Sequence, residues 1–355
     1  MQLPLHRDQF TEAGRVVLAS DAFTATAFRH PTGVEALRID TPRGLVKVLP
    51  FMGQMLWDAA FDGLRLTMKS QFNMPRPAPT IIGTYGCLAF HSGLLRNGVP
   101  TAADSHPVHG EFPTAPMDEA GPEIDGDTLR VTGRRDHIEG FGPHNRATPS
   151  VKLQAGQTLF DLGMAVENRS FAPMELMYMA HVNFDFLPGA RIVQPAPFTP
   201  DRTRVRAAVP AHVTPTPDYL ALIDALKDDP ARMETLSEPD RYDPEQVFYV
   251  RDPATDPQGL AHLLLQRPAG DGFALSYRPA EFPKLVRWIF VNGDTEVAAF
   301  ALPSTCEPEG YLAEKSKGNV RMLAPGETAR FSTRLGYVDR DEAAALARNI
   351  EGAGA

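Results

Sequence analysis

Short runs of hydrophobic residues, or of alternating hydrophobic and polar residues, recur along this chain of 355 residues. Glycine, proline, asparagine and aspartate separate the runs, a pattern that is typical of β-strands joined by turns. The pattern predicts strands at Val16–Ala19, Phe23–Phe28, Val34–Ile39, Leu45–Val48, Leu129–Gly133, Ser150–Leu153, Thr158–Glu167, Met174–His181, Val247–Val250, Leu260–Leu265, Gly272–Tyr277, Leu285–Asn292, Glu296–Leu302 and Ala329–Tyr337.

Helical periodicity is restricted to a few segments. It predicts a helix at Asp218–Leu226, a second short piece that extends to Leu236, and a helix at Asp339–Ile350 that Asp339 or Asp341 can cap. Strands at roughly ten-residue spacing without helices between them favour sandwiched antiparallel sheets over a βαβ fold. We therefore predict an all-β fold with short peripheral helices, and we expect residues 1–355 to form one domain.

Composition narrows the classes of function. The chain is 43% hydrophobic, enough for a large core, and its net charge of -9 argues against nucleic acid as a partner. Cys87 and Cys306 are its only cysteines, so neither a disulfide framework nor a zinc-thiolate site is expected. The sequence lacks a long apolar segment and an apolar N-terminal leader, which predicts a cytoplasmic protein that does not enter the membrane.

The candidate chemistry lies in two short segments, His106–Glu111 and Met179–Asp185. They bring histidines and carboxylates to predicted strand ends, and imidazoles exchange protons near neutral pH. Either segment alone is equally compatible with a turn that a hydrogen-bonded histidine closes. Taken together, the two segments favour a site that moves protons on a polar ligand.

An ordered set of motifs resembles the galactose mutarotase-like superfamily, and within it the aldose 1-epimerase-like family DUF4432. The motifs are Phe51–Asp58, Gly93-Leu94, Pro107–Glu111, His181–Phe184, which includes Asn183, and Leu323–Glu327. Their order covers nearly the whole chain. The resemblance implies an antiparallel β-supersandwich that binds a sugar on its concave face.

The resemblance also implies a reaction, the exchange of sugar anomers by opening and closing the pyranose ring. His181 would protonate the ring oxygen, and His109 would orient or polarise the same oxygen. A histidine suits this role because its ordinary pKa lies near the working pH. Such a reaction requires neither a cofactor nor a metal ion, and its partner is a small sugar or sugar derivative.

The general base departs from the family pattern, because Leu302 stands where the resemblance implies a glutamate. Leucine cannot accept a proton. A displaced carboxylate is the preferred alternative, with Glu309 ahead of Glu307, and Glu111 is a third candidate. Two solvated glutamates in a polar loop, at Glu307 and Glu309, are an equally good interpretation of the same residues.

Sugar recognition needs hydrogen-bonding side chains and an aromatic surface, and arginine suits an acidic sugar. Besides Glu111 and Asn183, the candidates for contacting substrate are His91, Arg96, His144, Arg146, Trp288 and Lys315. For most of them an ordinary role, as a solvated or core side chain, is the competing interpretation.

Two further hypotheses compete with a mutarotase. A metal-dependent sugar isomerase would use His106, His109 and Glu111 with His181 or His144, although an extended strand places His106 and His109 on opposite faces. A sugar sensor without catalysis would explain Leu302. A homodimer is compatible with the sequence, which does not fix the oligomeric state.

Overall fold

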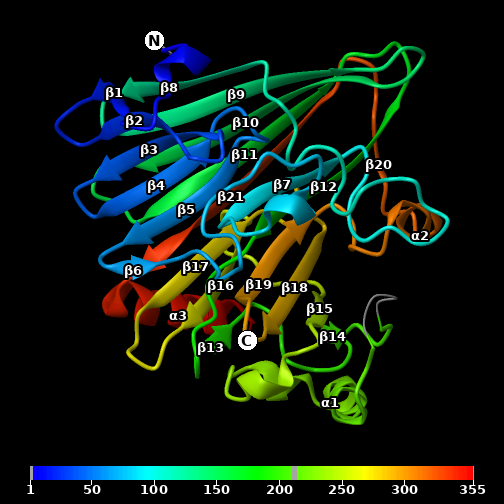
Figure 1. The fold of residues 1–355 in the computed structure, drawn as a ribbon. Coiled ribbons are helices and arrows are strands. Elements are labelled where there is room, and N and C mark those ends of the chain that lie inside the picture. The colour runs from blue at the N-terminus through cyan, green and yellow to red at the C-terminus, as the bar shows by residue number, and fades with distance from the viewer. Residues whose placement is uncertain (1–2, 210–213, 355) are drawn as a thin grey trace.

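Two antiparallel β-sheets pack face to face in the computed structural model, which describes residues 3–209 and 214–354 (Figure 1). The first sheet comprises β1 (Arg15–Ala19), β2 (Thr24–Arg29), β3 (Glu35–Thr41), β4 (Gly44–Leu49), β5 (Met55–Phe61), β6 (Leu64–Arg65), β7 (Ala89–Leu94), β12 (Met174–Val182), β14 (Thr203–Val205), β15 (Gln246–Val250), β18 (Lys284–Val291), β19 (Glu296–Ser304) and β20 (Arg321–Leu323). The second comprises β8 (Glu119–Asp125), β9 (Thr128–Ile138), β10 (His144–Gln154), β11 (Leu159–Asn168), β13 (Arg191–Val193), β16 (Ala261–Gln266), β17 (Gly272–Tyr277) and β21 (Thr328–Val338). The all-β prediction is confirmed.

The core lies between the two sheets. Phe61 of β5 meets Phe160 of β11 with ring centroids 6.0 Å apart, and Tyr178 of β12 meets Phe331 of β21 at 4.7 Å. Every second side chain of β10 and of β11 is buried, which is the alternation that a sheet with one solvated face requires. The alternation of hydrophobic and polar residues in the sequence therefore corresponds to the buried and solvated faces of the second sheet.

The helices lie at the periphery (Figure 1). They are α1 (Pro217–Asp228), α2 (Tyr311–Ser316) and α3 (Arg340–Gly354), with 3-10 turns η1 (Arg7–Gln9), η2 (Ile81–Thr84), η3 (Pro230–Met233) and η4 (Pro239–Arg241). The predicted helices at 218–226 and 339–350 are confirmed, and Asp339 caps α3 by accepting the N–H groups of Asp341 and Glu342. Among the described residues, no helix has the length and apolar character needed to span a bilayer.

The prediction missed several strands, and β7 shows why. All six of its residues are buried, and its sequence mixes alanine, phenylalanine, histidine, serine, glycine and leucine. A strand that is buried along its whole length does not alternate between hydrophobic and polar residues. The strand pairs with β12 and carries the polar side chains of His91 and Ser92 into the interior of the protein.

Candidate functional site

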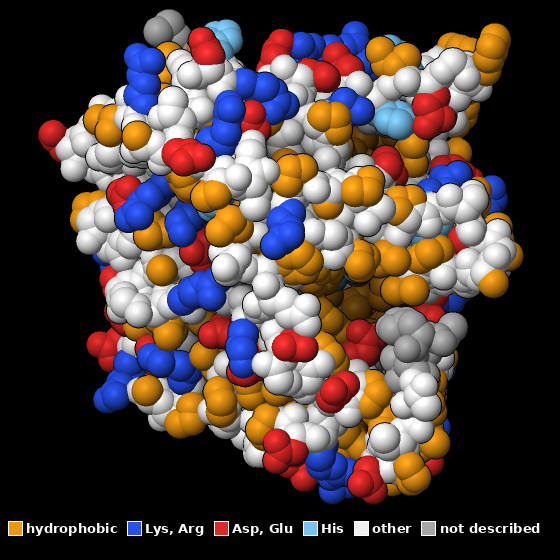
Figure 2. Space-filling view, in the orientation of Figure 1, with side chains coloured by type: hydrophobic (Ala, Val, Ile, Leu, Met, Phe, Trp, Pro, Cys, Tyr) orange, Lys and Arg blue, Asp and Glu red, His pale blue; other side chains and the backbone are white. Residues whose placement is uncertain are grey.

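A cavity of about 380 Å³ lies over four neighbouring strands of the first sheet, in the order β12, β19, β18 and β15. Figure 2 shows a hollow lined mainly by hydrophobic side chains near the place where Figure 1 labels β15 and β18. Val286 pairs with Leu302, and Val247 pairs with Trp288. Paired residues point to the same face of a sheet, so these four side chains form a floor under the cavity.

Loops from the N-terminal half of the chain close the cavity above this floor. They contribute Phe72, Ile82, Tyr85, Val99 and Val108, and the hydroxyl of Tyr85 lies 3.4 Å from Nε2 of His181. The cavity is therefore formed by loops and strands that are distant in sequence and come together beside β12.

His109 enters the cavity from a tightly held turn. Its φ is +63°, its N–H donates to the carbonyl of Gly98, and its carbonyl accepts the N–H of Gly93. Nδ1 lies 3.2 Å from Oγ of Ser92, and that hydroxyl donates its one hydrogen to Asn97. Nδ1 of His109 therefore donates to Ser92, and Nε2 is the acceptor in the neutral ring.

His181 stands beside His109 on the cavity face of β12. The two ring centroids are 4.7 Å apart, and the His181 ring stacks on Phe90 at 4.5 Å. Nδ1 of His181 is buried and has no hydrogen-bond partner among the described residues. An imidazole held in this way is rigid but poorly solvated.

Burial shifts both imidazoles toward the neutral form. It lowers the pKa of His109 to about 4, and the nearby His106 adds to the effect. Burial also lowers the pKa of His181 well below 6.5; His109 lowers it further, whereas Asn183 acts in the opposite direction. Both rings are therefore neutral at pH 7 in this structure.

Glu245 and Arg206 face the same cavity as an ion pair. Nη2 of Arg206 lies 2.6 Å from one carboxylate oxygen, and Nε1 of Trp288 donates to the other at 2.5 Å. The Trp288 ring centroid is also 6.0 Å from that of His181. Trp288, which lines the cavity, therefore links the carboxylate to the pair of histidines.

Leu302 lies in the floor, so the position that the resemblance assigns to a glutamate does face the cavity. Glu309 is not among the lining residues; it follows Pro308, which is, and it accepts a hydrogen bond from the hydroxyl of Tyr249. Glu307 is turned toward Lys317 at 2.8 Å. Of these carboxylates, Glu309 remains next to the cavity and Glu307 is committed to an ion pair.

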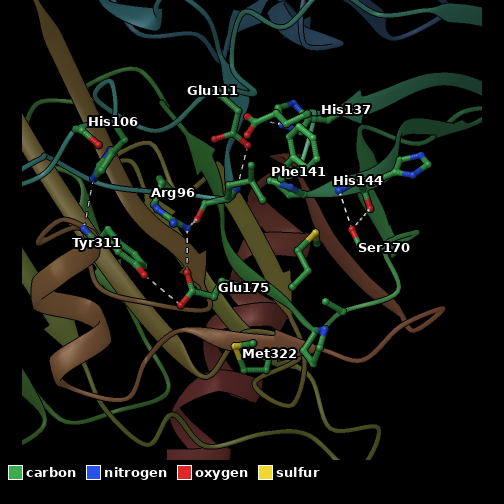
Figure 3. Close-up of a pocket in the computed structure, with 18 of the residues that line it drawn as sticks. Arg96, His106, Glu111, His137, Phe141, His144, Ser170, Glu175, Tyr311 and Met322 are labelled. Carbon is green, nitrogen blue, oxygen red and sulfur yellow. Dashed lines mark hydrogen bonds and ion pairs between the residues drawn. The ribbon is translucent and has the colours of Figure 1, made fainter.

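Several other predicted residues line a second, wider cleft of about 1390 Å³ instead (Figure 3). Arg96 lies 3.7 Å above the ring of Tyr311 and 3.2 Å from Glu175, which Lys315 also contacts at 2.9 Å. Glu111 accepts the backbone N–H groups of Leu94 and Leu95, so it braces β7. These groups already satisfy one another, which leaves them little capacity for a ligand.

The remaining predicted contacts are dispersed. His144 lines the wide cleft, and Arg146 is paired with Asp136 at 2.7 Å. His91 is fully buried against the hydroxyl of Tyr178 at 2.8 Å, and Asn183 is fully buried and donates to the carbonyl of Cys87. Burial lowers the pKa of His91 to about 3. His91 and Asn183 hold β7 and β12 in place behind the cavity.

The residues of the metal hypothesis do not converge. His106 lines the wide cleft, where Nδ1 lies 2.9 Å from the carbonyl of Pro107 and Nε2 accepts the N–H of Tyr311, whereas His109 faces the smaller cavity. Within residues 3–209 and 214–354, no group of three or more histidine, cysteine, aspartate or glutamate side chains is placed to hold a metal ion.

Tyr85, Arg206 and Glu245 are among the polar cavity residues that the sequence did not reveal. Arg206 and Glu245 lie in loops 39 positions apart, and neither belongs to a motif. The only local signal is that Glu245 directly precedes a strongly hydrophobic strand, β15. The sequence does not predict which side chains of this strand face the cavity.

The fold and family of the chain are apparent from known proteins. Residues 31–337 match the family described as "Domain of unknown function (DUF4432)". A crystal structure from Klebsiella pneumoniae subsp. pneumoniae, provisionally described as an aldose 1-epimerase, superposes with a TM-score of 0.80 at 17% identity, covering 100% of this chain and 92% of that one. A galactose mutarotase-like protein from Clostridium acetobutylicum gives 0.60 at 12% identity, covering 90% and 100%. No curated protein matches the sequence.

Proposed function

We propose that this chain, which belongs to the DUF4432 family, is an aldose 1-epimerase that interconverts the anomers of a monosaccharide in the cavity at His109 and His181. The observation that carries the proposal is the meeting of two buried imidazoles, with ring centroids 4.7 Å apart, and a carboxylate in the lining of one cavity. Ring opening needs these groups, because one proton must leave the C1 hydroxyl while another reaches the ring oxygen.

The size of the cavity suits a single sugar ring. Small-molecule sites usually measure about 300–1,000 Å³, and this cavity of about 380 Å³ lies near the lower limit. The wide cleft exceeds that range, and its Arg96 is paired with Glu175 at 3.2 Å. We therefore assign the chemistry to the smaller cavity.

We assign proton removal from the C1 hydroxyl to Glu245. Its two oxygens each accept one hydrogen bond, from Arg206 and from Trp288, and a carboxylate oxygen has two lone pairs. Each oxygen can therefore accept a sugar hydroxyl as well. Glu309 is the alternative base, because it lies beside Pro308 at the cavity.

His181 takes the role of the acid at the ring oxygen, which requires its imidazolium form. Since burial keeps its ring neutral in this structure, His181 must take up a proton from solvent before it can donate one to the ring oxygen. His109, whose Nε2 is an acceptor, orients a sugar hydroxyl. After rotation about the C1–C2 bond, His181 and Glu245 exchange roles and the ring closes.

NMR saturation-exchange between sugar anomers tests the proposal. We expect wild-type protein to accelerate exchange for at least one aldose, and the His181→Ala variant to lose most of the acceleration. His144→Gln, in the wide cleft, is the discriminating variant. If His144→Gln abolished exchange while His181→Ala did not, the wide cleft would be the active site.

A sugar sensor is the second candidate, and the observation that favours it is Leu302 in the floor of the cavity. Trp288 offers a direct measure of binding, since it lines the cavity while Trp57, the other tryptophan, is buried in a separate cluster. In a Trp57→Phe variant, a sugar that alters fluorescence without accelerated anomer exchange would support the sensor.

A further inference from the structure

The cavity has an apolar middle and polar groups at two places. His109, His181 and the hydroxyl of Tyr85 form one polar group, and the Arg206–Glu245 pair forms the other. The floor residues Val247, Val286 and Leu302, together with Met179, are almost completely buried. These side chains provide no donor, and apart from the weak thioether of Met179 they provide no acceptor.

The apolar surface extends to the histidine that would serve the ring oxygen. Met179 lies two residues before His181 on β12 and therefore points to the same face. The ring of Phe90 stacks on His181, and Trp288 approaches it edge-on at 6.0 Å. A substituent close to the ring oxygen would thus meet hydrocarbon from Met179 and Trp288, which both line the cavity.

The atom of an aldohexose that occupies this position is C6. The exocyclic C6 is bonded to C5, which is bonded to the ring oxygen, so C6 lies near whichever side chain protonates that oxygen. A C6 hydroxyl placed against Met179 and Leu302 would lose its hydrogen bonds to water and gain none from the protein, which is unfavourable. A C6 methyl group would gain from the same burial.

The charged residues do not favour an acidic group at C6. Arg206 is the cation that lines the cavity, and Glu245 already neutralises it at 2.6 Å. The other polar lining residues, Ser70, Gln71 and Thr295, lie in half-buried or exposed loop segments. The hydroxyl of Ser70 accepts the N–H of Phe72 and donates to the carbonyl of Phe72 at 3.5 Å.

We infer that the substrate is a 6-deoxyaldohexose, with its C6 methyl group packed on Met179 and Leu302 and its ring oxygen at His181. This inference rests on the proposed anomer exchange in the same cavity. Selectivity of this kind is limited, because an apolar pocket rejects an added hydroxyl by about 100-fold at most. We therefore expect a preference of roughly 10- to 100-fold.

Matched sugars that differ only at C6 test the inference on the unaltered protein. In each of three series the substituent on C5 is CH₂OH, CH₃ or H, in that order. The first series is D-galactose, D-fucose and L-arabinose, and the second is L-galactose, L-fucose and D-arabinose. The third is L-mannose, L-rhamnose and L-lyxose. In the series that the protein accepts, we expect kcat/KM for anomer exchange to be highest with CH₃ and lowest with CH₂OH. Equal rates, or a preference for CH₂OH, would overturn the inference.

A pair of variants tests whether the floor causes the preference. Leu302→Gln places an amide in the floor and should reduce the CH₃ preference by about 5-fold or more, whereas Leu302→Met keeps the floor apolar and should retain it. An unchanged preference in a folded Leu302→Gln protein would contradict the assignment of the floor to C6; if that variant does not fold, the sugar series decides. If the protein accelerates anomer exchange only for hexoses with CH₂OH, the inference of a 6-deoxy substrate is rejected and the proposed function stands. If it accelerates exchange for no sugar, the proposed function itself is rejected.

Discussion

The rings of His109 and His181 meet nearly at right angles, with their centroids 4.7 Å apart and an interplanar angle of 80°. The two residues come from different structural contexts, a turn of positive φ and the C-terminal end of a sheet strand. Nε2 of His109 is the acceptor of its neutral ring, and Nδ1 of His181 has no hydrogen-bond partner among the described residues. Such a pair can hold and transfer a proton, so a change to either ring should alter the rate of proton transfer.

Replacement of either histidine should remove most of the acceleration of anomer exchange. We expect His109→Ala and His181→Ala each to lower kcat by about 10²- to 10⁴-fold, the usual contribution of an acid or base. NMR saturation-exchange measures the rates, and circular dichroism checks the fold. Wild-type rates in both folded variants would place the chemistry elsewhere.

Ser92→Ala should alter His109 without removing a contact to the sugar. The variant removes the oxygen that Nδ1 of His109 contacts at 3.2 Å, so the ring loses the partner that fixes its tautomer. We expect a drop of about 10-fold in kcat/KM, with a changed pH profile. Ser92→Thr, which keeps the hydroxyl, is the matched control. Identical pH profiles in all three proteins would disprove this positioning role.

Glu245→Gln should separate turnover from binding. The amide keeps the size of the carboxylate and accepts hydrogen bonds at one oxygen, but it cannot take up a proton, so kcat should collapse while KM changes little. Glu309→Gln is the parallel variant for the alternative base. Loss of turnover in Glu309→Gln alone would transfer the role of base to that residue.

The exchange rate should rise as the pH falls. His181 acts as an imidazolium, and its pKa lies well below 6.5, so the reactive fraction grows as pH decreases from about 8 toward about 5. A kcat/KM profile for the free enzyme reports the protonation of His181. A flat profile over this range would show that His181 acts as a neutral donor.

Asp185 provides a test of stability. Burial raises its pKa to about 6 from 3.8, so the folded protein binds its proton more readily than the unfolded chain, and the cost of the buried charge is present above about pH 6. Asp185→Asn should therefore stabilise the protein at about pH 7 by on the order of 1 kcal/mol, after allowance for partial exposure. The gain should shrink as pH falls from about 6 to about 4, and thermal unfolding at several pH values measures it.

Local patterns determined the fold class. The alternation along β10 and β11, the cap at Asp339 and the periodicity of α1 follow from sequence, because strand alternation and helix capping depend on residues within a few positions. The histidines also lie in recognisable motifs. Strands such as β7 were not predicted, because a strand that is buried on both faces does not alternate between hydrophobic and polar residues.

Only the tertiary structure decided which residues share a cavity. The sequence indicated Arg96, Glu111 and Lys315 as ligand contacts. In the structure Arg96 and Lys315 both pair with Glu175, and Glu111 accepts a backbone N–H group. Glu245 and Arg206 gave no sign in the sequence and meet through a pairing of distant loops. The physical reason is that strand register sets which side chains face each other, and register depends on contacts between segments far apart in the chain.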